Sequence, residues 1–352
     1  MIAPLAIGLV TSFLVTPLVR ALAHRGRLLD HPGPRSSHRT VTPRGGGLAI
    51  LAGLAAALLL RRGDWTATPP VLALLAGAAA VALVGLLDDR FGLPPLPRFL
   101  CQLAAALGLV AGTGGVERLP LPPPFDVPTG PLASPLAVLW VLAVVNFMNF
   151  MDGIDGLAGL QGFVTALALA LAGPEPSGTL LAAALAGGCA GFLFFNWAPA
   201  SIFLGDVGSG LVGYTVAAIP LLAPPTTRPQ AVLLAGTSLW LLLSDATTCL
   251  LRRVARGDRW YEAHRQHLYQ RWVATGVGHA RAAAAIELGS AATTVLALLG
   301  WRAGTPSWAW AGLALGALLF GLEWRTVLRA EQRATRHAAG SLVQRSGESA
   351  RG

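Results

Sequence analysis

The residues best suited to chemistry in this 352-residue chain form four polar clusters within an otherwise apolar sequence. The first cluster is the pair Asp88 and Asp89, which ends a long apolar run. Two adjacent carboxylates at the edge of such a run are costly unless they are solvated, paired or bound to a cation. Acidic side chains at a helix C-terminus also oppose the helix dipole. The pair is therefore a candidate cation site, with a solvated helix end as the alternative.

The second cluster, residues 146–159, carries Asn146, Asn149 and Asp152 at intervals of three, with Asp155 three positions further on. Residues at this spacing can share one face of a helix. Three glycines at the same interval permit turns and the close approach of a ligand to the backbone. Packing alone does not require two asparagines and two aspartates in a stretch of ten residues at the edge of a bilayer. A ligand-binding function is the favoured interpretation.

The third cluster, residues 196–210, begins at Asn196 and contains Asp206 among glycines, just before another apolar segment. A carboxylate beside the N-terminus of a helix could organise a phosphate and a metal ion together. The plainer interpretation of Asp206 is an N-cap that satisfies backbone N–H groups. The sequence leaves both open.

The fourth cluster, residues 252–269, is basic and includes His264, Arg265 and His267. These side chains could donate charge-assisted hydrogen bonds to the oxygens of a diphosphate. Zinc is a second interpretation of the histidines, but no third or fourth ligand lies nearby in the sequence. A third is an amphipathic surface helix lying on acidic lipid.

A smaller basic segment, residues 30–47, contains Arg35 and His38 and leads into a run of glycines. It is either a phosphate contact or a plain connecting loop. Together the five segments offer carboxylates for Mg²⁺, and arginine, histidine and backbone N–H groups for phosphate oxygens. The sequence contains no Walker loop. This combination predicts a phosphoryl-transfer site in which Asp206 and Asp88 are the candidate metal ligands.

The elements that must position these clusters are transmembrane helices. The chain is 54% hydrophobic and only 12% charged, whereas charged residues make up about a quarter of a soluble protein. A spanning helix needs about 20 mostly apolar residues. The segments that satisfy or approach this are residues 2–22, 44–61, 70–87, 97–113, 132–149, 157–173, 178–196, 208–223, 230–251, 282–300 and 305–324. We predict an all-α, polytopic membrane bundle of about eleven helices, with one transmembrane catalytic domain (1–325) and a flexible tail (326–352).

The distribution of arginine predicts the orientation of this bundle. All 26 basic residues are arginine, and the first apolar run is followed rather than preceded by them, which argues against a cleaved signal peptide. The positive-inside rule then places the N-terminus outside and the C-terminus in the cytoplasm. Twenty-one arginines fall on the predicted cytoplasmic side and five on the other. All four clusters lie on the cytoplasmic side. No basic stripe lies on a soluble module, so a nucleic-acid partner is not expected.

The clusters resemble the motifs of the polyprenyl-phosphate N-acetylhexosamine-1-phosphate transferases, which are glycosyltransferases of family 4. Asp88-Asp89 is similar to the family's aspartate pair, and residues 146–159 to its Asn-x-x-Asn-x-x-Asp-Gly-x-Asp-Gly-Leu-Ala motif. Residues 196–209 resemble its Asn-x-x-Pro-Ala-x-x-Phe-x-Gly-Asp-x-Gly-Ser motif. The first cytoplasmic loop also matches, and the resemblance covers residues 1–325.

The fourth cluster separates branches of the family. The peptidoglycan branch carries three consecutive histidines there, whereas this chain has His264-Arg-Gln-His267. The segment is closer to the O-antigen and enterobacterial initiating enzymes, which use UDP-N-acetylglucosamine or related 6-deoxy sugars.

The resemblance implies transfer of N-acetylhexosamine 1-phosphate from a UDP-sugar to undecaprenyl phosphate, with release of UMP, at the cytoplasmic face of a bacterial inner membrane. It implies Mg²⁺ as cofactor, with Mn²⁺ as a substitute, and a lipid substrate that enters from the bilayer. A homodimer stays open. The predicted catalytic residues are Asp88, Asp89, His264 and His267, and the predicted substrate-binding residues are Asn149, Asp152, Asp155, Asn196, Arg265, Arg35 and His38. Direct in-line attack is favoured over a phospho-aspartate intermediate. The alternative function is a transporter or lipid flippase with a cytoplasmic acidic site.

Overall fold

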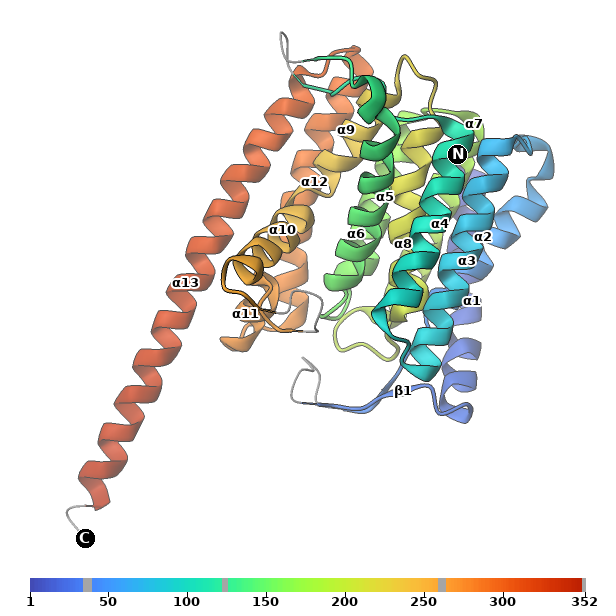
Figure 1. Ribbon diagram of the computed structural model, residues 1–352. Helices are drawn as coiled ribbons and strands as arrows, with labels where there is room; N and C mark the ends of the chain where they lie inside the picture. The colour runs from blue at the N-terminus through green and yellow to red at the C-terminus, as the bar shows by residue number, and fades with distance from the viewer. Residues whose placement is uncertain (34–39, 122–125, 259–263, 350–352) are drawn as a thin grey trace.

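The computed structural model describes the backbone of residues 1–33, 40–121, 126–258 and 264–349, and the side chains of these ranges through residue 335. This part of the chain contains thirteen α-helices and one two-stranded antiparallel sheet (Figure 1). The elements are α1 (Ile2–Arg25), β1 (Leu29–Asp30), β2 (Thr42–Pro43), α2 (Gly47–Leu60), α3 (Pro69–Phe91), α4 (Pro95–Thr113), α5 (Ala133–Phe150), α6 (Leu157–Ala172), α7 (Pro176–Asn196), α8 (Gly205–Ala218), α9 (Arg228–Ser238), α10 (Trp240–Ala255), α11 (Leu268–Ala274), α12 (His279–Ala303) and α13 (Ser307–Ser349). The predicted all-α bundle is confirmed.

Eight helices of the described residues are long and apolar enough to span a membrane, and the bent pair α9–α10 brings the number up to nine. The helices α2 and α6 are also apolar but shorter, with 14 and 16 residues. The protein is therefore a multi-pass membrane protein. The count of eleven spans and the orientation of the termini stay predictions.

The segment predicted as one span over residues 230–251 is instead two helices that meet at an angle of 73°. Side chains from other helices satisfy the carbonyl oxygens at the break. Gln161 donates to the Ser238 carbonyl at 3.1 Å, and Thr293 donates to the Thr237 carbonyl at 3.1 Å. A break inside a membrane is tolerated where neighbouring helices supply such partners.

The centre of the bundle is formed by α7 and α8, whose side chains are mostly buried, whereas α1 and α13 are largely exposed. Small residues bring these helices close to their neighbours. Gly187 of α7 lies against the backbone of α1 at Leu5, and Gly47 of α2 lies against Gly208 of α8. A side chain at either glycine would collide with backbone atoms, so the close helix contacts depend on them.

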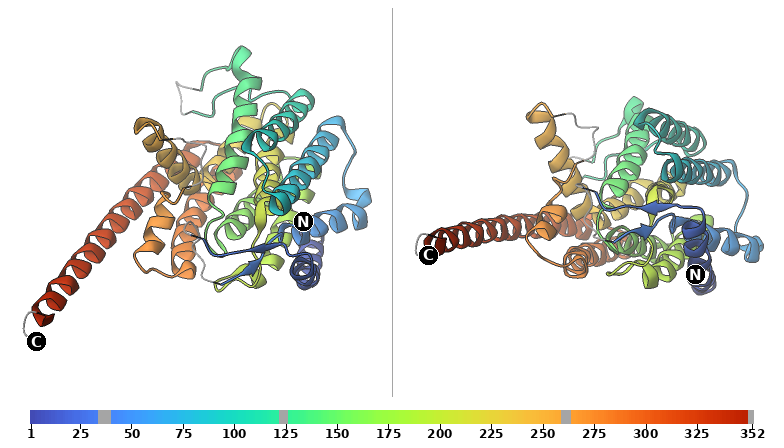
Figure 2. Two further views of the ribbon diagram at one scale, coloured as in Figure 1. Left: turned by 60° about the horizontal axis from the view of Figure 1, so that its bottom comes forward. Right: turned by 90° about the horizontal axis from the view of Figure 1, so that it is seen from below.

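The polar clusters gather where α1, α3, α5 and α7 end and where α2, α4, α6 and α8 begin, which we call the site end (Figure 2). The β1–β2 hairpin lies here, with Leu29 opposite Pro43. The amide of Phe203 donates to the Pro43 carbonyl at 2.8 Å, and the amide of Gly46 returns a bond to the Phe203 carbonyl at 2.9 Å. These bonds fix the connection between α1 and α2 against the loop that leads into α8.

The segment predicted as a tail, residues 326–349, continues α13, which extends well past the bundle (Figure 1). Glu331 of α13 accepts two bonds from Arg271 of α11, at 2.8 and 2.7 Å. This bidentate pair holds α13 against α11. The flexibility of the tail stays a prediction.

Candidate active site

A polar cavity of about 260 Å³ opens at the site end and collects residues from the first three clusters and from the first connecting loop. Its lining residues are Asp30, Arg44, Asp89, Asn149, Asp152, Gly153, Ile154, Asp155, Asn196, Phe203, Gly205, Asp206, Gln270 and His279. Six predicted site residues are thus brought together although they lie up to 117 positions apart. The shared cavity supports one site rather than several separate helix ends.

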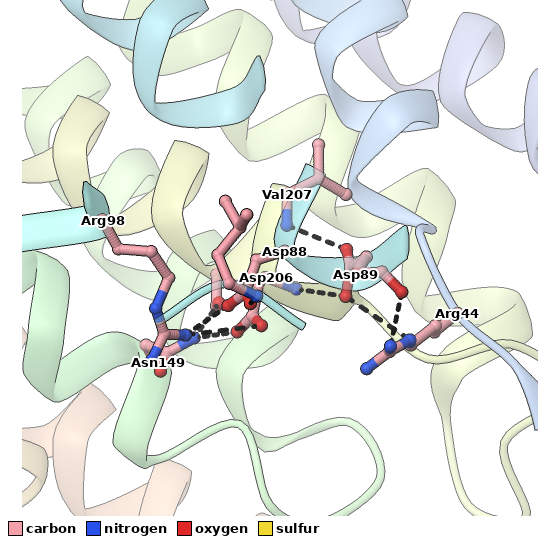
Figure 3. Close-up of polar contacts among 9 residues, drawn as sticks. Arg44, Asp88, Asp89, Arg98, Asn149, Asp206 and Val207 are labelled. Carbon is pink, nitrogen blue, oxygen red and sulfur yellow. Dashed lines mark hydrogen bonds and ion pairs between the residues drawn. The ribbon is translucent and has the colours of Figure 1, made fainter. Parts of the chain in front are cut away.

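Asp89 binds the N-terminus of α8 from the end of α3 (Figure 3). Its carboxylate accepts the amides of Asp206 and Val207 at 3.0 and 3.1 Å, and Arg44 lies 3.7 Å away. The guanidinium of Arg44 also donates to the Asp89 carbonyl. A carboxylate at a helix N-terminus is stabilised by the unpaired amides and the helix dipole. Asp89 therefore fixes α8 against α3 and compensates for its own unfavourable position at the end of α3.

Asp88, the preceding residue of α3, lies beside Asp206 and is held by two further partners. One oxygen accepts the Leu93 amide at 2.6 Å, and the other forms an ion pair with Arg98 of α4. Arg98 also lies 3.7 Å from Asp206 and so bridges the two carboxylates (Figure 3). Asp88 is absent from the described lining of the polar cavity. Its predicted roles as a metal ligand and a catalytic residue stay predictions, but both of its oxygens have structural partners.

Asp206 lies in the first turn of α8 and faces α5 as well as α4. Asn149, in the last turn of α5, donates to one Asp206 oxygen and also to the Ser209 hydroxyl at 3.0 Å. The three-residue spacing of the second cluster thus serves to place Asn149 against α8. The other Asp206 oxygen faces Arg98, and the residue borders the polar cavity.

Asp152 lies two residues after the end of α5 and lines the polar cavity without a hydrogen bond or ion pair to any side chain that the structure describes. Burial raises the pKa of Asp152 well above its usual range, and the neighbouring carboxylates of Asp206, Asp89, Asp155 and Asp30 raise it further. Crowded carboxylates of this kind are relieved by protonation or by a bound cation.

Asp155 and Asn196 connect the second and third clusters. The Asp155 carboxylate accepts the Ala200 amide at 3.0 Å. Its Oδ1 atom lies 3.3 Å from Nδ1 of His279, the first residue of α12. The buried amide side chain of Asn196 accepts the Gly156 amide at 3.1 Å and donates to the Ile202 carbonyl at 3.0 Å. Asn196 therefore connects the loop before α6 to the loop before α8, and both loops contribute to the cavity wall.

The fourth cluster lies beside the cavity rather than in its described lining. His264 and His267 are adjacent to each other near α10, with ring centroids 4.9 Å apart. The short helix α11 that follows them contributes Gln270 to the cavity, and the Tyr269 hydroxyl donates to the Phe150 carbonyl at 2.9 Å. Diphosphate binding by His264, His267 and Arg265 stays a prediction. Arg35 and His38 lie outside the described residues.

A second cavity of about 360 Å³ adjoins the polar one between α3, α4, α5 and α8. Its lining is mostly apolar and comprises Val81, Val84, Gly85, Pro95, Leu96, Arg98, Phe99, Cys101, Gln102, Val145, Asn146, Asn149, Phe150, Asp206 and Gly210. Asn149 and Asp206 line both cavities, and Arg98 lies between Asp206 and Asp88. An apolar space and a carboxylate-rich space therefore meet at one pair of polar residues.

Comparison with known proteins places these features in a family. The model for glycosyl transferase family 4 matches residues 71–223. A probable undecaprenyl-phosphate N-acetylglucosaminyl 1-phosphate transferase of Bacillus subtilis is 31% identical over 280 residues, which cover 78% of this chain and 77% of the relative. The chain belongs to glycosyl transferase family 4.

Two other family 4 relatives differ in their named reactions. A decaprenyl-phosphate N-acetylglucosaminephosphotransferase of Mycobacterium tuberculosis H37Rv is 34% identical over 319 residues, covering 81% of this chain and 78% of the relative. A phospho-N-acetylmuramoyl-pentapeptide-transferase of Heliobacterium modesticaldum is 38% identical over 246 residues, covering 65% and 74%. The predicted family is confirmed, whereas the O-antigen branch stays a prediction.

Sequence reasoning missed several residues of this family 4 site. Arg44 and Arg98 are paired with the aspartates, and Gln270 and His279 line the cavity. Arg44 stands in a segment that the sequence did mark as basic. His279 stands alone before an apolar segment, and no local pattern distinguishes it from a surface histidine.

Proposed function

We propose that the protein transfers N-acetylhexosamine 1-phosphate from a UDP-sugar to undecaprenyl phosphate, giving undecaprenyl-diphospho-sugar and UMP. The observation that carries the proposal is the meeting of the polar and apolar cavities at Asn149 and Asp206. The reaction joins a water-soluble diphosphate to a phosphate on a long prenyl chain, so it needs both environments at one point. The names of the family 4 relatives, which specify prenyl phosphate acceptors and amino sugars, support the same reaction.

The residues of the polar cavity fit a magnesium ion. Asp152 has no described partner, and its raised pKa reflects the crowding of carboxylates that a divalent cation would relieve. Asp152 and Asp206 would hold the ion with hard oxygen ligands, for which Mn²⁺ is a workable substitute. When bound, the ion would neutralise charge on the diphosphate of the donor.

The apolar cavity suits the first prenyl units of the acceptor. Val81, Val84 and Leu96 offer apolar walls, and the cavity lies among helices that border the membrane. Arg98 provides a cation at the end of this cavity nearest Asp206. A lipid phosphate placed beside Arg98 would therefore lie next to the donor in the polar cavity.

We favour direct transfer. An oxygen of the lipid phosphate attacks the phosphorus that bears the sugar, the bond from that phosphorus to the bridging oxygen breaks, and UMP leaves with the bridging oxygen. Asp88 and Asp89 are poorly suited as covalent nucleophiles because the oxygens of both carboxylates have hydrogen-bond partners. A general base is of limited use because a phosphate monoester, with a second pKa of about 6, is already ionised near neutrality.

The cell location follows from the arginine distribution. In the predicted topology, 21 of the 26 arginines fall on the side that carries the polar clusters, which supports a cavity open to the cytoplasm of a bacterial inner membrane. UDP-sugars are soluble and would reach the cavity from that side. We expect the donor to be UDP-N-acetylglucosamine or a 6-deoxy relative, and the product to initiate an O-antigen type of glycan.

The proposal is tested with protein purified in detergent. UDP-N-acetylglucosamine, UDP-N-acetyl-6-deoxyhexosamines and UDP-N-acetylmuramoyl-pentapeptide are each incubated with undecaprenyl phosphate and Mg²⁺, and UMP is measured. UMP release that requires the lipid, with the first or second donor, is expected. Absence of UMP with every donor overturns the proposal, and release with the pentapeptide donor alone overturns the choice of branch. A transporter would produce no UMP in detergent, so the assay also separates that alternative.

The position of the acceptor is tested by filling the apolar cavity. Cys101→Trp adds bulk to its wall, whereas Leu107→Trp places the same large side chain at an exposed position of the same helix, α4. The Cys101 variant should raise the KM for undecaprenyl phosphate at least about tenfold and leave the affinity for the UDP-sugar near the wild-type value. Equal effects of the two variants would place the prenyl chain elsewhere.

A further inference from the structure

A pair of amide side chains lies in the wall of the apolar cavity, between α4 and α5. Gln102 and Asn146 both line this cavity, and Nδ2 of Asn146 donates to Oε1 of Gln102 at 2.8 Å. Both residues are partly buried. Most other residues of the lining are apolar. The pair is therefore a polar group in a wall that otherwise suits a hydrocarbon chain.

The backbone of α5 fixes the direction in which this pair presents its hydrogen-bond donors. Nδ2 of Asn146 also donates to the Leu142 carbonyl at 2.8 Å, one turn earlier in the helix. Since a carbonyl oxygen only accepts, this bond sets the orientation of the Asn146 amide, and both of its N–H groups are then used. The oxygen of Gln102 must therefore face Asn146. This leaves Nε2 of Gln102 with two N–H groups that have no partner among the described residues.

The other nitrogen donors of the described lining already have partners. Nδ2 of Asn149 donates to Asp206 and Ser209, and Arg98 is paired with Asp88. The amide of Gln102 is thus the one neutral side-chain nitrogen of the described lining that keeps unused N–H groups. An amide donor without a partner is costly beside an apolar space, so this one points to a ligand that carries an acceptor oxygen.

We propose that Gln102 donates a hydrogen bond to the phosphate of the lipid acceptor and so orients it for transfer. The inference rests on the proposed function, which assigns the apolar cavity to the prenyl chain. That chain is a hydrocarbon, so the phosphate is the part of the acceptor that can accept a hydrogen bond. Arg98 lies one turn before Gln102 on the same face of α4, about 5.4 Å away along the helix axis. A phosphate between them would be bound by the guanidinium on one side and by the amide on the other.

Binding from two sides would determine which oxygen of the acceptor attacks. Asn149 and Asp206 line both cavities, at the same end of the apolar cavity as Arg98. Gln102 lies one turn further from that end. An oxygen held by Gln102 therefore faces away from the polar cavity, and the remaining non-ester oxygens of the phosphate face the donor. Gln102 would contact the substrate without taking a proton or forming a covalent bond.

The test compares two short prenyl ligands that differ only in the phosphate, farnesyl phosphate and farnesol. Binding of each to the full chain is measured in detergent by isothermal titration calorimetry at pH 8. Gln102→Leu removes the donor and keeps an apolar side chain of similar length. It should weaken farnesyl phosphate binding about 10- to 100-fold, the range for a hydrogen bond to a charged group, and leave farnesol binding near the wild-type value.

A second variant, Gln102→Glu, separates substrate binding from a structural role. Its carboxylate keeps an oxygen that can accept the bond from Asn146, but it places a second oxygen where the amide donor stood. If Gln102 only supported Asn146, this variant would bind farnesyl phosphate as the wild type does. If Gln102 binds the phosphate, the loss should be at least as large as in Gln102→Leu. The matched control Gln332→Glu, at an exposed position of α13, should leave both affinities unchanged.

The outcomes distinguish this inference from the proposed function, because the binding measurement uses no UDP-sugar. Wild-type affinity of folded Gln102→Glu for farnesyl phosphate overturns the inference, as does an equal loss of farnesyl phosphate and farnesol binding in Gln102→Leu. A wild type that binds farnesyl phosphate more tightly than farnesol but releases no UMP contradicts the proposed function alone. In the turnover assay, Gln102→Leu should raise the KM for undecaprenyl phosphate and leave the KM for the UDP-sugar near the wild-type value.

Discussion

Replacement of Asp152 by asparagine should stabilise the protein in the absence of metal and abolish its stabilisation by Mg²⁺. Asp152 has no described partner and lies among the carboxylates of Asp206, Asp89, Asp155 and Asp30. Asparagine keeps the size of the side chain and removes one negative charge. The variant thus separates two effects of Asp152: destabilisation of the metal-free protein by charge repulsion, and stabilisation of the protein by bound Mg²⁺.

The magnitude follows from the size of the chain. Single stabilising substitutions, including those that relieve unfavourable charge, are commonly worth about 0.5–2 kcal/mol. With an unfolding entropy of about 2.1 cal/mol/K per residue, 352 residues give roughly 0.7 kcal/mol/K, so the melting temperature should rise by about 1–3 °C. A cation at a hundred times its Kd stabilises the folded state by about 2.7 kcal/mol, or about 4 °C here. The variant should melt above the wild type in chelator and below it in saturating Mg²⁺.

The same change has a defined pH dependence. The raised pKa of Asp152 means that its ionised form is disfavoured in the folded state. The destabilisation is fully present above the folded pKa and is lost as the pH falls through that pKa toward the unfolded value of about 3.9. The advantage of Asp152→Asn in chelator should therefore shrink on acidification.

The assay is thermal unfolding in detergent, followed by intrinsic fluorescence, with chelator or Mg²⁺ across a range of pH. Asp126→Asn is the control, because Asp126 lies in an exposed ion pair with Arg118 and should change stability by less than about 1 kcal/mol at any Mg²⁺ concentration. A lower melting temperature of Asp152→Asn in chelator would refute the crowding argument. Equal Mg²⁺ stabilisation of variant and wild type would remove Asp152 from the cation site.

Three further predictions concern metal, base and topology. Asp206→Asn should fold but lose about 10²-fold or more in turnover at every Mg²⁺ concentration, and near-normal turnover would contradict its assignment. Asp88→Asn should lower the rate by a factor that stays constant between about pH 6 and 9, because its partners indicate positioning, whereas a general base would give the greatest loss at low pH, where more lipid phosphate is protonated. In a cysteine-free chain, Arg118→Cys should be labelled from outside intact cells and Asp258→Cys should not; labelling of position 258 would reverse the orientation.

Patterns that are local in the sequence predicted the fold and pointed to residues that share one cavity. Each predicted apolar segment corresponds to a helix or a helix pair. A helix that spans a bilayer needs a continuous run of apolar residues, and such a run is visible in the sequence. Asp89, Asn149, Asp152 and Asp206 were identified because several polar residues at an apolar edge have no explanation in packing. The structure brings all four to one cavity.

Features that depend on contacts between distant segments were not predictable in this way. The bend between α9 and α10 is accommodated by side chains of α6 and α12, and the local composition of residues 230–251 does not indicate it. His279 reaches the cavity only because α12 begins beside Asp155. Asp245 of α10 accepts the amides of Leu268 and Tyr269 only because α11 lies against it, and the composition of residues 230–251 does not indicate this contact.

The carboxylates of the site end differ in how completely their charges are compensated by neighbouring groups. Asp89 and Asp88 are occupied by backbone amides and arginines, so their charges hold α3 against α8 and α4. Asp152 has no described partner, and Asp206 contacts the Asn149 amide, the Asp88 carboxylate and, at 3.7 Å, Arg98. A cation adds most stability where anionic oxygens are least compensated. The adjacent aspartates, which first suggest a metal site in the sequence, therefore connect the helices, and we propose that Asp152 and Asp206 are the residues that would hold the ion.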